Sequence, residues 1–528
     1  MAYVKLILLS FAISQIYFVC ALNVLAIVSL PLKSHYMSFQ TLFQELSLRG
    51  HSVTVTNNYP DKAPPKNLSF IHMNASQRHN FTALSEFEKY NSFFSIFFNF
   101  YVHFTMGPKH TKEDCESFFA NENIKAIRDK RDRFDVIFVE QFISDCGLVY
   151  AAVFYDAPII GITSHTLLPW AYTRLGIPFD VGSDAFYFSN AGTNPPLYNK
   201  FLNFLMNAYA NTIGRWQLNS EIYQVFNQYL PNTTFDVERI AKEKMVMMFS
   251  NQHHSVTGAR LLAPRVLEIG GMHIKKSNTI PESIKKILST AEHGVVYVSF
   301  GSNLKASTMS KHKFDQFLDA FSRIPQKVLW KLENTTHPPG HDHIFLHEWF
   351  PQLDILCHPK VLAFISHGGM LSVSEAAHCG KPLLAIPFFG DQFSNAAAVV
   401  DSGLGLTMHF KDVTAENLAD AIKSLTSPKM QNDAKRVSTL WHDRPMNVMD
   451  SAIYWTEYVA RHKEVASLPT TYKSWFETSL LDVYSALLVL LIVLYLIIYY
   501  ICKIVYLVMV MLFGVLVTKE IKDKKKCA

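Results

Sequence analysis

Short apolar runs alternate with amphipathic stretches along most of the chain, and this alternation predicts parallel α/β structure. Residues 24–30 are apolar apart from Ser29, as in a strand that is buried on both faces. A loop and a helical pattern that ends at Gly50 come next, and the β-branched run 52–56 follows. The helical pattern rests on four apolar positions: Phe39, Leu42, Phe43 and Leu46. Strand, helix and strand in this order form a βαβ unit, whose strands lie parallel.

The pattern recurs in two blocks, which predicts two domains. In the first block we expect further strands at 136–139 and 158–163, and a mostly helical, aromatic-rich stretch from 170 to 245. The second block is more regular. Its expected strands are 295–300, 327–330, 344–347, 361–365 and 383–386, and its expected helices are 313–323 and 372–379, the latter closed by Gly380. We therefore expect two Rossmann-like domains, 22–275 and 276–465, which face each other across a cleft and bind ligands at the carboxyl ends of their strands.

An apolar segment at the start of the chain predicts a secretory leader. The first residues carry one charged side chain, Lys5, ahead of the apolar run 6–19. Small residues follow at the positions where a leader is cleaved. We predict a signal peptide over 1–21, with an N-terminal anchor helix as the alternative.

A second apolar segment near the end predicts a membrane anchor. The twenty residues 483–502 carry no charge, and at 1.5 Å per residue they span a hydrocarbon core of about 30 Å. Another apolar run, 504–517, follows Lys503 and is too short for a span of its own. We expect one tilted transmembrane helix within 483–517, with the Lys503 side chain reaching towards the membrane surface.

The segments around the anchor predict its orientation and its compartment. The tail 518–528 is net positive, and positive flanks stay cytoplasmic, so we expect a type I protein with a luminal body. Lys525 and Lys526 resemble the dilysine signal that returns such proteins to the endoplasmic reticulum membrane. Five glycosylation sequons agree with a luminal body: Asn67, Asn74, Asn80, Asn232 and Asn334. Four cysteines of the body show no tight spacing, and the sequence leaves their pairing open: Cys115, Cys146, Cys357 and Cys379.

Composition removes several classes of protein. Of the 528 residues, 49% are hydrophobic and only 18% are charged, which excludes a disordered chain. Seven cysteines are too few for a disulfide scaffold of this length. The 49 Lys and Arg residues nearly balance the 44 Asp and Glu residues, so we expect no nucleic-acid partner. We see no His and Asp cluster with metal-ligand spacing either, and we expect no metal site.

The turn after the expected strand 361–365 carries the pattern of a phosphate site. His367 and two glycines lie at this turn, and a helical pattern begins just after Gly369. Such a helix start offers free N–H groups and the positive end of the helix dipole, which bind phosphate. The imidazole of His367 can add a further donor.

Polar residues beyond this turn suit the hydroxyl groups of a nucleoside and a sugar. Ser372 and Glu375 lie in the first turns of the expected helix, where the Glu375 carboxylate can accept from ribose hydroxyls. Asp391 and Gln392 follow the next strand at the same sheet edge, and they offer acceptors and donors to sugar hydroxyls.

This ordered set resembles the signature of the UDP-glycosyltransferase family, which contains the UDP-glucuronosyltransferases, and it is most similar to insect members. The turn from Trp349 to Gln352 resembles the family's uridine-binding turn, and Gly301-Ser302 resembles its first diphosphate-contacting turn. The resemblance implies the GT-B fold, with a UDP-sugar as co-substrate in the C-terminal half and no further cofactor. The donor-binding residues that it implies are Gly301, Ser302, Lys331, Trp349, Gln352, His367, Gly369, Ser372, Glu375, Asp391 and Gln392. For Lys331, a surface position is the alternative.

Catalysis needs a base from the other half, and His35 lies in the loop after the first strand. The resemblance matches this residue to the family's catalytic histidine, which an Asp at the end of a later strand orients. Two residues compete for that role here, Glu140 by its place in the strand and Asp145 by residue type and its place before Cys146. We prefer Asp145, because insect-like members carry a similar Asp-Cys pair, and capping of the following helix is its alternative role.

The resemblance implies an inverting displacement, in which His35 deprotonates an acceptor hydroxyl and UDP leaves. We expect UDP-glucose as the donor and UDP-glucuronate as the alternative, since the insect members that the chain resembles mostly use UDP-glucose. Phe388 and Phe389 offer no cation for a glucuronate carboxylate, and Leu371, where vertebrate members often have Asn, adds support. The acceptors that the family implies are small, lipophilic and hydroxyl-bearing. The aromatic stretch 91–104 could line their pocket, touch the membrane surface or form a core helix.

Two other classes of protein compete with this hypothesis. A non-catalytic, membrane-tethered binding protein could use the same scaffold, and the uncertain partner of His35 is its support. A Rossmann oxidoreductase is disfavoured, because no G-x-G-x-x-G follows a strand. The oligomeric state stays open, a homo-oligomer included.

Overall fold

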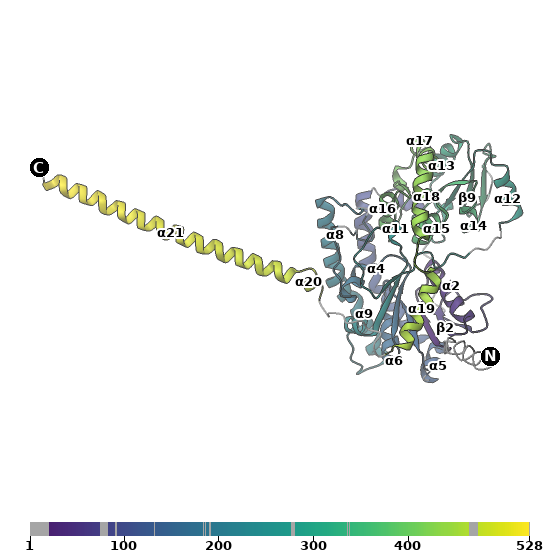
Figure 1. Ribbon diagram of the computed structural model, residues 1–528, viewed down its shortest axis with the longest axis horizontal. Coiled ribbons are helices and arrows are strands. Elements are labelled where there is room, and N and C mark those ends of the chain that lie inside the picture. Colours follow the sequence, from purple (N-terminus) through teal and green to yellow (C-terminus); the bar gives the residue numbers. More distant parts are fainter. Residues whose placement is uncertain are drawn as a thin grey trace, which may run out of the picture. The chain divides into compact units, whose positions relative to one another are not determined.

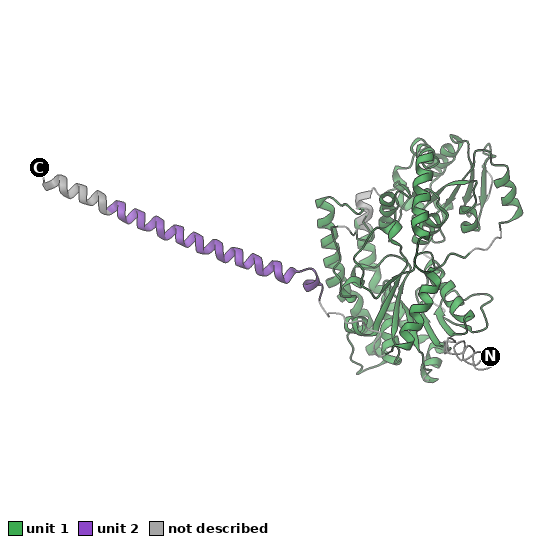
Figure 2. Cartoon of the chain, viewed as in Figure 1, with its two compact units in different colours: residues 1–472 green, residues 473–528 purple. Residues whose placement is uncertain are grey.

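The computed structural model describes residues 21–526 apart from several short gaps. The gaps are 74–82, 90–91, 131, 183, 185, 190–191, 276–279, 335, 337 and 464–473, and side chains are not described at 92–96, 98 and 515–526. The chain divides into two compact units, 1–472 and 473–528 (Figure 2). The predicted signal peptide lies almost wholly outside the described residues, as do Asn74 and Asn80.

The first domain is built on a seven-stranded parallel sheet in the order β3-β2-β1-β4-β5-β6-β7. Its strands are β1 (Asn23–Ile27), β2 (Ser52–Asn57), β3 (Leu68–His72), β4 (Val136–Glu140), β5 (Ile159–Thr163), β6 (Met245–Ser250) and β7 (Val266–Glu268). Alternate residues of β1 enter different cores, Val24 and Ala26 on one face and Leu25 and Ile27 on the other. Burial on both faces of the sheet thus explains the apolar run at 24–30, as the sequence predicted.

The second domain is built on a six-stranded parallel sheet in the order β10-β9-β8-β11-β12-β13. Its strands are β8 (Val295–Ser299), β9 (Lys327–Lys331), β10 (Ile344–His347), β11 (Val361–Ser366), β12 (Leu383–Ala385) and β13 (Gly405–Thr407). Five of them lie where the sequence predicted strands. The two sheets therefore give the predicted pair of Rossmann-like domains, both within the first unit (Figure 1).

Helices cover both sheets (Figure 1). In the first domain they are α2 (Lys33–Leu48), α3 (Leu84–Phe87), α4 (Ser92–Ala120), α5 (Glu122–Lys130), α6 (Cys146–Phe154), α7 (Pro169–Arg174), α8 (Leu197–Tyr209), η1 (Ala210–Gly214), α9 (Arg215–Tyr229), α10 (Val237–Lys244) and α11 (His254–Thr257). Those that follow are α12 (Glu282–Ser289), η2 (Ala306–Thr308), α13 (Lys311–Ser322), α14 (Gln352–Leu356), α15 (Met370–Cys379), α16 (Gln392–Ser402), η3 (Phe410–Asp412), α17 (Ala415–Leu425), α18 (Pro428–His442) and α19 (Val448–Arg461).

The strands that the sequence did not predict are β3, β6, β7 and β13. Strands β7 and β13 have three residues each, too few for a pattern to emerge. Strand β6 is the methionine-rich run at the end of the stretch that we expected to be mostly helical. Methionine favours helices by intrinsic propensity, and burial between neighbouring strands overrides that preference here.

Helix α19 returns to the first domain, although it lies within the stretch 276–465 that we assigned to the second. Ala452, Ile453 and Val459 join the apolar cluster formed by one face of the first sheet and helix α2. At the edge, the Arg49 guanidinium pairs with the Asp450 carboxylate at 2.5 Å. The last helix of the first unit thus completes a core that the first 50 residues begin.

Two disulfides cross-link helices within the first unit. Cys115 of α4 bonds Cys146 at the start of α6, and Cys357 after α14 bonds Cys379 at the end of α15. These are the four cysteines whose pairing the sequence left open.

The second unit contains α20 (Trp475–Thr478) and α21 (Leu481–Lys526). Within α21, the stretch Leu481–Gly514 is long and apolar enough to cross a membrane, and it includes Lys503. It overlaps the predicted span 483–517 and is consistent with a membrane anchor.

Substitution in α19 tests its part in the first domain. Ile453 is 1% exposed, and Ile453→Ala should lower the free energy of unfolding by about 2–5 kcal/mol through lost contacts and a residual cavity. Tyr454→Ala is the matched control, because Tyr454 is 45% exposed on the same helix. Denaturant unfolding of the detergent-solubilised protein measures both. Equal stability of the two variants would contradict this packing.

Candidate active site

A cavity of about 1430 Å³ lies between the two domains and is lined by residues of both. From the first domain come the segments that follow β1, β4 and β5, together with one side of α4. From the second come the turns after β8, β11 and β12 and the start of α14. Because all these strands are parallel, the turns lie at the carboxyl edges of the two sheets, where ligands bind in such folds.

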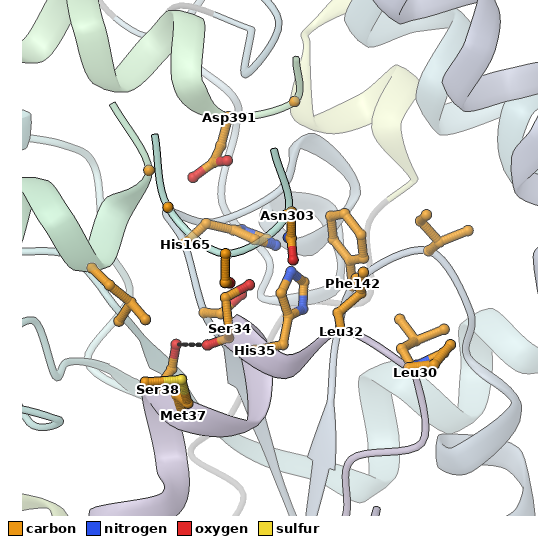
Figure 3. Close-up of a pocket in the computed structure, with 18 of the residues that line it drawn as sticks. Leu30, Leu32, Ser34, His35, Met37, Ser38, Phe142, His165, Asn303 and Asp391 are labelled. Carbon is orange, nitrogen blue, oxygen red and sulfur yellow. Dashed lines mark hydrogen bonds between the residues drawn. The ribbon is translucent and has the colours of Figure 1, made fainter. Parts of the chain in front are cut away.

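His35 and Glu140 form a buried pair at the first-domain side of this cavity. Strands β1 and β4 are neighbours, and the chain passes from β1 through a short loop into α2. His35 is the third residue of α2 and not a loop residue as the sequence predicted, and this first helical turn meets the last residue of β4. His35 Nδ1 contacts Glu140 Oε1, and the exposed fractions of the two side chains are 13% and 3%. A carboxylate at Nδ1 keeps the proton on that nitrogen and leaves Nε2 free to accept one. His35 lines the cavity and its ring rises into it (Figure 3).

Asp145 does not contact His35, which corrects our preference for it. Its carboxylate accepts from Arg174 Nη1 at 3.0 Å and Nη2 at 2.7 Å and also pairs with Arg215. Burial alone would raise the pKa of Asp145, but the two guanidiniums outweigh it and hold the pKa below its usual value. Asp145 is the residue before α6, yet its side chain does not cap that helix. The strand ends at Glu140, and the turn beyond it aims Asp145 away from the cavity and towards α7 and α9.

On the second-domain side, β11 ends at Ser366 and α15 begins at Met370, as the phosphate-site hypothesis requires. The His367 ring lies between two glycines. A Cβ atom on Gly301 would come within 2.7 Å of the ring, and one on Gly369 would clash with Nε2. Both glycines thus leave room for the imidazole. Burial and the nearby Lys331 ammonium lower the pKa of His367 to about 4, so the ring is neutral at pH 7.

Lys331 and Trp349 lie next to each other in the second-domain lining of the cavity. Lys331 Nζ donates to the carbonyl oxygen of Gly301 and lies 5.2 Å from the centre of the Trp349 ring. Burial lowers the pKa of Lys331, so this side chain is no ordinary surface lysine. Trp349 keeps 61% of its surface exposed, which leaves an aromatic face for a stacked base. Lys33 of the first domain reaches the same ring, 5.8 Å from its centre.

Gln352 is hydrogen-bonded to two other predicted residues, Ser372 and Glu375. Gln352 Nε2 donates to Glu375 Oε2 at 2.8 Å and to Ser372 Oγ at 3.3 Å. The Tyr297 hydroxyl donates to Gln352 Oε1 at 3.3 Å. All four residues line the cavity, together with Ser302.

The turn before α16 carries Asp391 and Gln392, which have different tasks. Gln392 Oε1 accepts from the backbone N–H groups of Phe388 at 2.9 Å and Phe389 at 3.2 Å, so it holds the turn itself. Asp391 Oδ2 accepts from Asn395 at 2.8 Å. Asp391 points into the cavity from the second domain (Figure 3).

His165 is a site residue that the sequence analysis missed. It lies just after β5, buried between the sheet edge and the cavity, and its Nδ1 donates to the Thr166 carbonyl at 2.7 Å. Its ring centre is 6.0 Å from that of His35, and Phe142 packs against both rings. Figure 3 shows His165 between His35 and Asp391. Its signal was a Ser-His pair directly after a strand, and a second Ser-His pair, Ser34-His35, follows β1 at the start of α2.

Residues 92–104 of the predicted aromatic stretch form the first half of α4, and the described side chains there serve two purposes. Phe100 and Phe104 pack in an apolar cluster with Trp170 and Phe186, as in a core helix. Asn99, Val102 and His103 line the cavity. The core and pocket-lining alternatives therefore both hold for the described side chains of this stretch.

The remaining predicted sites are simpler. Asn67, Asn232 and Asn334 are exposed. Among the residues that the structure describes, no group of three His, Cys, Asp or Glu side chains is arranged to hold a metal ion.

Comparisons with known proteins agree with this geometry. The profile of the family described as "UDP-glucoronosyl and UDP-glucosyl transferase" matches residues 25–514. Two proteins of Dactylopius coccus, "UDP-glycosyltransferase UGT5" and "UDP-glucosyltransferase 2", are each 32% identical to the chain, over 91% and 89% of it and 92% and 90% of their own lengths. "UDP-glucuronosyltransferase 2B30" of Macaca fascicularis is 29% identical over 86% of the chain and 88% of its own length.

A solved structure shows the same fold. "LpCGTa in complex with UDP" superposes with a TM-score of 0.54 and 17% identity, covering 84% of this chain and 100% of that one. The parallel sheets, the cavity between them and the profile match lead to one conclusion: the protein belongs to the UDP-glucuronosyl and UDP-glucosyl transferase family, and it is a GT-B glycosyltransferase that uses a UDP-sugar donor.

Proposed function

We propose that the protein transfers glucose from UDP-glucose to a hydroxyl group of small lipophilic acceptors, with inversion at the anomeric carbon. The observation that carries this proposal is the arrangement of the cavity. A buried His35–Glu140 pair lies on one side of it, and a glycine-flanked helix start with His367 lies on the other.

The base is His35 in this mechanism. Its Nε2 takes the proton of the acceptor hydroxyl while the oxygen forms a bond to the anomeric carbon, and the bond to the diphosphate oxygen breaks. The Glu140 carboxylate at Nδ1 stabilises the imidazolium that results. The free N–H groups at the start of α15, with His367 and Ser302, receive the charge that develops on the leaving UDP.

The nucleoside has a matching set of groups in the second domain. The exposed face of Trp349 suits uracil, and Lys331 beside it suits the diphosphate. Glu375, oriented by Gln352 at 2.8 Å, suits the ribose hydroxyls. Asp391 suits hydroxyls of the transferred sugar. A non-catalytic binding protein has lost its support, because that alternative rested on the uncertain partner of His35.

The donor sugar is proposed from the charge around Asp391. Glucuronate needs a cation for its carboxylate, and the nearby group from the first domain is His165. Burial lowers the pKa of His165, which favours the neutral ring at pH 7. An uncharged hexose suits this surrounding better than glucuronate, which stays the alternative.

The lipophilic acceptor is proposed from the lining of the first-domain side. Phe142 packs against His35, and Val102, Met106 and Phe188 add apolar surface to the same cavity. An apolar pocket with one convergent base suits a small molecule with a single reactive hydroxyl.

We also propose that the protein is a single-pass type I protein of the endoplasmic reticulum membrane with luminal domains. The apolar helix, the basic tail and the lysines near the end support this orientation. Two disulfides and three exposed sequon asparagines in the first unit suit an oxidising, glycosylating compartment.

Paired substitutions test the assignment of the base and its partner. With 1-naphthol as acceptor and UDP-glucose as donor, we expect His35→Ala and Glu140→Gln to lower kcat by about 10²–10⁴-fold, with UDP binding retained. Asp145→Asn should lower stability instead, because it leaves two buried guanidiniums underpaired. The assay uses microsomes, with rates normalised to folded protein. Full activity of Glu140→Gln would refute the pair, and no conjugate with either donor and several phenols would refute the function.

The role of His165 in donor choice has its own test. His165→Arg places a fixed cation opposite Asp391 and should raise the ratio of kcat/KM for UDP-glucuronate over UDP-glucose by about tenfold or more. His165→Gln is the matched control, since it is neutral and should keep the preference for glucose. An unchanged ratio in His165→Arg would show that the sugar lies elsewhere.

The pKa of His367 predicts a proton-linked donor affinity. The pKa is about 4 in the empty site, and a bound diphosphate would raise it. The complex then holds more protons than the free enzyme, so UDP-glucose affinity should rise as pH falls, by at most about tenfold per unit. His367→Gln should remove this slope. Calorimetry in two buffers of different ionisation enthalpy measures the proton uptake, and equal uptake in both proteins would place His367 away from the diphosphate.

A further inference from the structure

A short segment of the first domain is embedded in the second. Leu84 and Phe87, both from α3, belong to the apolar cluster that contains Val298 and Phe388 of the second domain. Leu84 is fully buried there and Phe87 is 8% exposed. This segment, residues 83–89, precedes helix α4 in the chain, and we refer to it as the α3 strap.

Polar contacts fix the α3 strap to the loop between β8 and α13. Ala83 forms a parallel bridge with Lys305, and the Leu84 N–H donates to Thr308 Oγ1 at 2.9 Å. Glu88 Oε1 accepts from the N–H of Ser310 at 2.9 Å. Ser310 is the residue that caps α13, so the Glu88 carboxylate lies at the positive end of that helix. The strap is thereby bound at both of its ends.

Between these ends, Phe87 supports the turn that carries Asp391. Its ring lies edge-on to Phe388, with centres 5.3 Å apart, and against Phe389 at 6.4 Å. Gln392 fixes the same two residues from within the second domain through their N–H groups. The turn 388–392 is therefore held from two sides, by its own domain and by the strap.

Helix α4 adds one more contact to this turn. The Gly390 N–H donates to Asn99 Oδ1 at 3.4 Å, and Asn99 is 7% exposed. Phe87, Asn99 and Asp391 all line the cavity. The helix that lines the acceptor side thus also contacts the donor-sugar side.

We propose that Phe87 and Glu88 of the α3 strap are positioning residues for the donor sugar. They act by holding the turn 388–392 in place. This inference rests on the proposed function, since the turn is where Asp391 meets the sugar. The strap contacts the sugar-side turn, while Trp349 and Gln352, which serve the nucleoside, lie in other segments. Its loss should weaken recognition of the sugar and leave recognition of UDP unchanged. A shift of about 1 Å at such a turn is enough to cost on the order of 10²-fold in rate.

The experiment separates the sugar from the nucleotide. The Kd values of UDP and of UDP-glucose are measured on the full chain in detergent, and kcat and KM are measured in microsomes. For Phe87→Ala we expect KM and Kd for UDP-glucose to rise about tenfold or more, with the Kd for UDP changed by less than about twofold. Phe87→Leu should recover most of the loss, because it refills the space beside Phe388.

Two further variants complete the design. Glu88→Gln should show the same pattern more weakly, since it keeps the acceptor oxygen and removes the charge at the start of α13. Glu86→Gln is the matched control on the same short helix, because the Glu86 carboxylate pairs with Lys89 of the strap at 3.2 Å and is half exposed. It should leave all four constants unchanged. Thermal unfolding of each variant confirms that the compared proteins are folded.

Each outcome bears on one proposal. Equal loss of UDP and UDP-glucose affinity in Phe87→Ala, or no loss of either while the protein is folded, would overturn the positioning role. If Phe87→Ala does not fold, the ratio of the two Kd values in Glu88→Gln decides the matter. Failure of the wild-type chain to bind UDP would instead reject the proposed function. If the wild-type enzyme prefers UDP-glucuronate, the Kd of UDP-glucuronate replaces that of UDP-glucose in the same comparison with UDP.

Discussion

The carboxylate of Glu140, buried at the end of β4, is the constraint on which the catalytic side of the molecule depends. A charge in such a place needs a partner, because its desolvation is otherwise costly. The parallel pairing of β1 and β4 brings Ile27 opposite Val139, so the next residues of both strands leave the sheet side by side. The short loop after β1 leads into α2, and the first turn of that helix brings His35 to the carboxylate. The imidazole is oriented by the sheet before any substrate is present.

The two domains divide the chemistry by charge. In the proposed mechanism the first supplies the imidazole of His35, held by the buried Glu140 carboxyl group, with aromatic side chains such as Phe142 around this pair. The second supplies helix-start N–H groups, Lys331 and a neutral His367, all suited to an anionic leaving group. The proposed mechanism places the reacting bond between these two surroundings, so it needs both domains. The cross-domain contacts of Lys33, Asn99 and Phe87 are accordingly part of the site.

The sequence predicted most of the strands, and all the donor-side residues that the sequence and the resemblance indicated line the cavity. The strands and the phosphate turn were predictable because their patterns are local. A strand buried on both faces is continuously apolar, and a phosphate turn keeps its glycines and histidine within a few residues. It was wrong about Asp145, because a pattern does not tell which way a side chain points after a turn. Residue type and proximity favoured Asp145, and packing against Arg174 and Arg215 decided otherwise. His165 and the strap at 83–89 were missed for a related reason: their importance comes from a partner in another part of the chain.

The return of α19 to the first domain has a consequence for how the protein is made. The face of the first sheet around Val24 and Phe39 is synthesised at the start, but Ile453 and Val459 cover it only when the chain is nearly complete. Ribosomes add about 5–20 residues per second, so this apolar face waits roughly 10–40 s after its own domain has emerged. During that interval the nascent chain offers a hydrophobic surface to chaperones and to other unfolded chains. A truncated chain that ends before residue 448 would leave this apolar face uncovered, even though all strands of its first sheet are present.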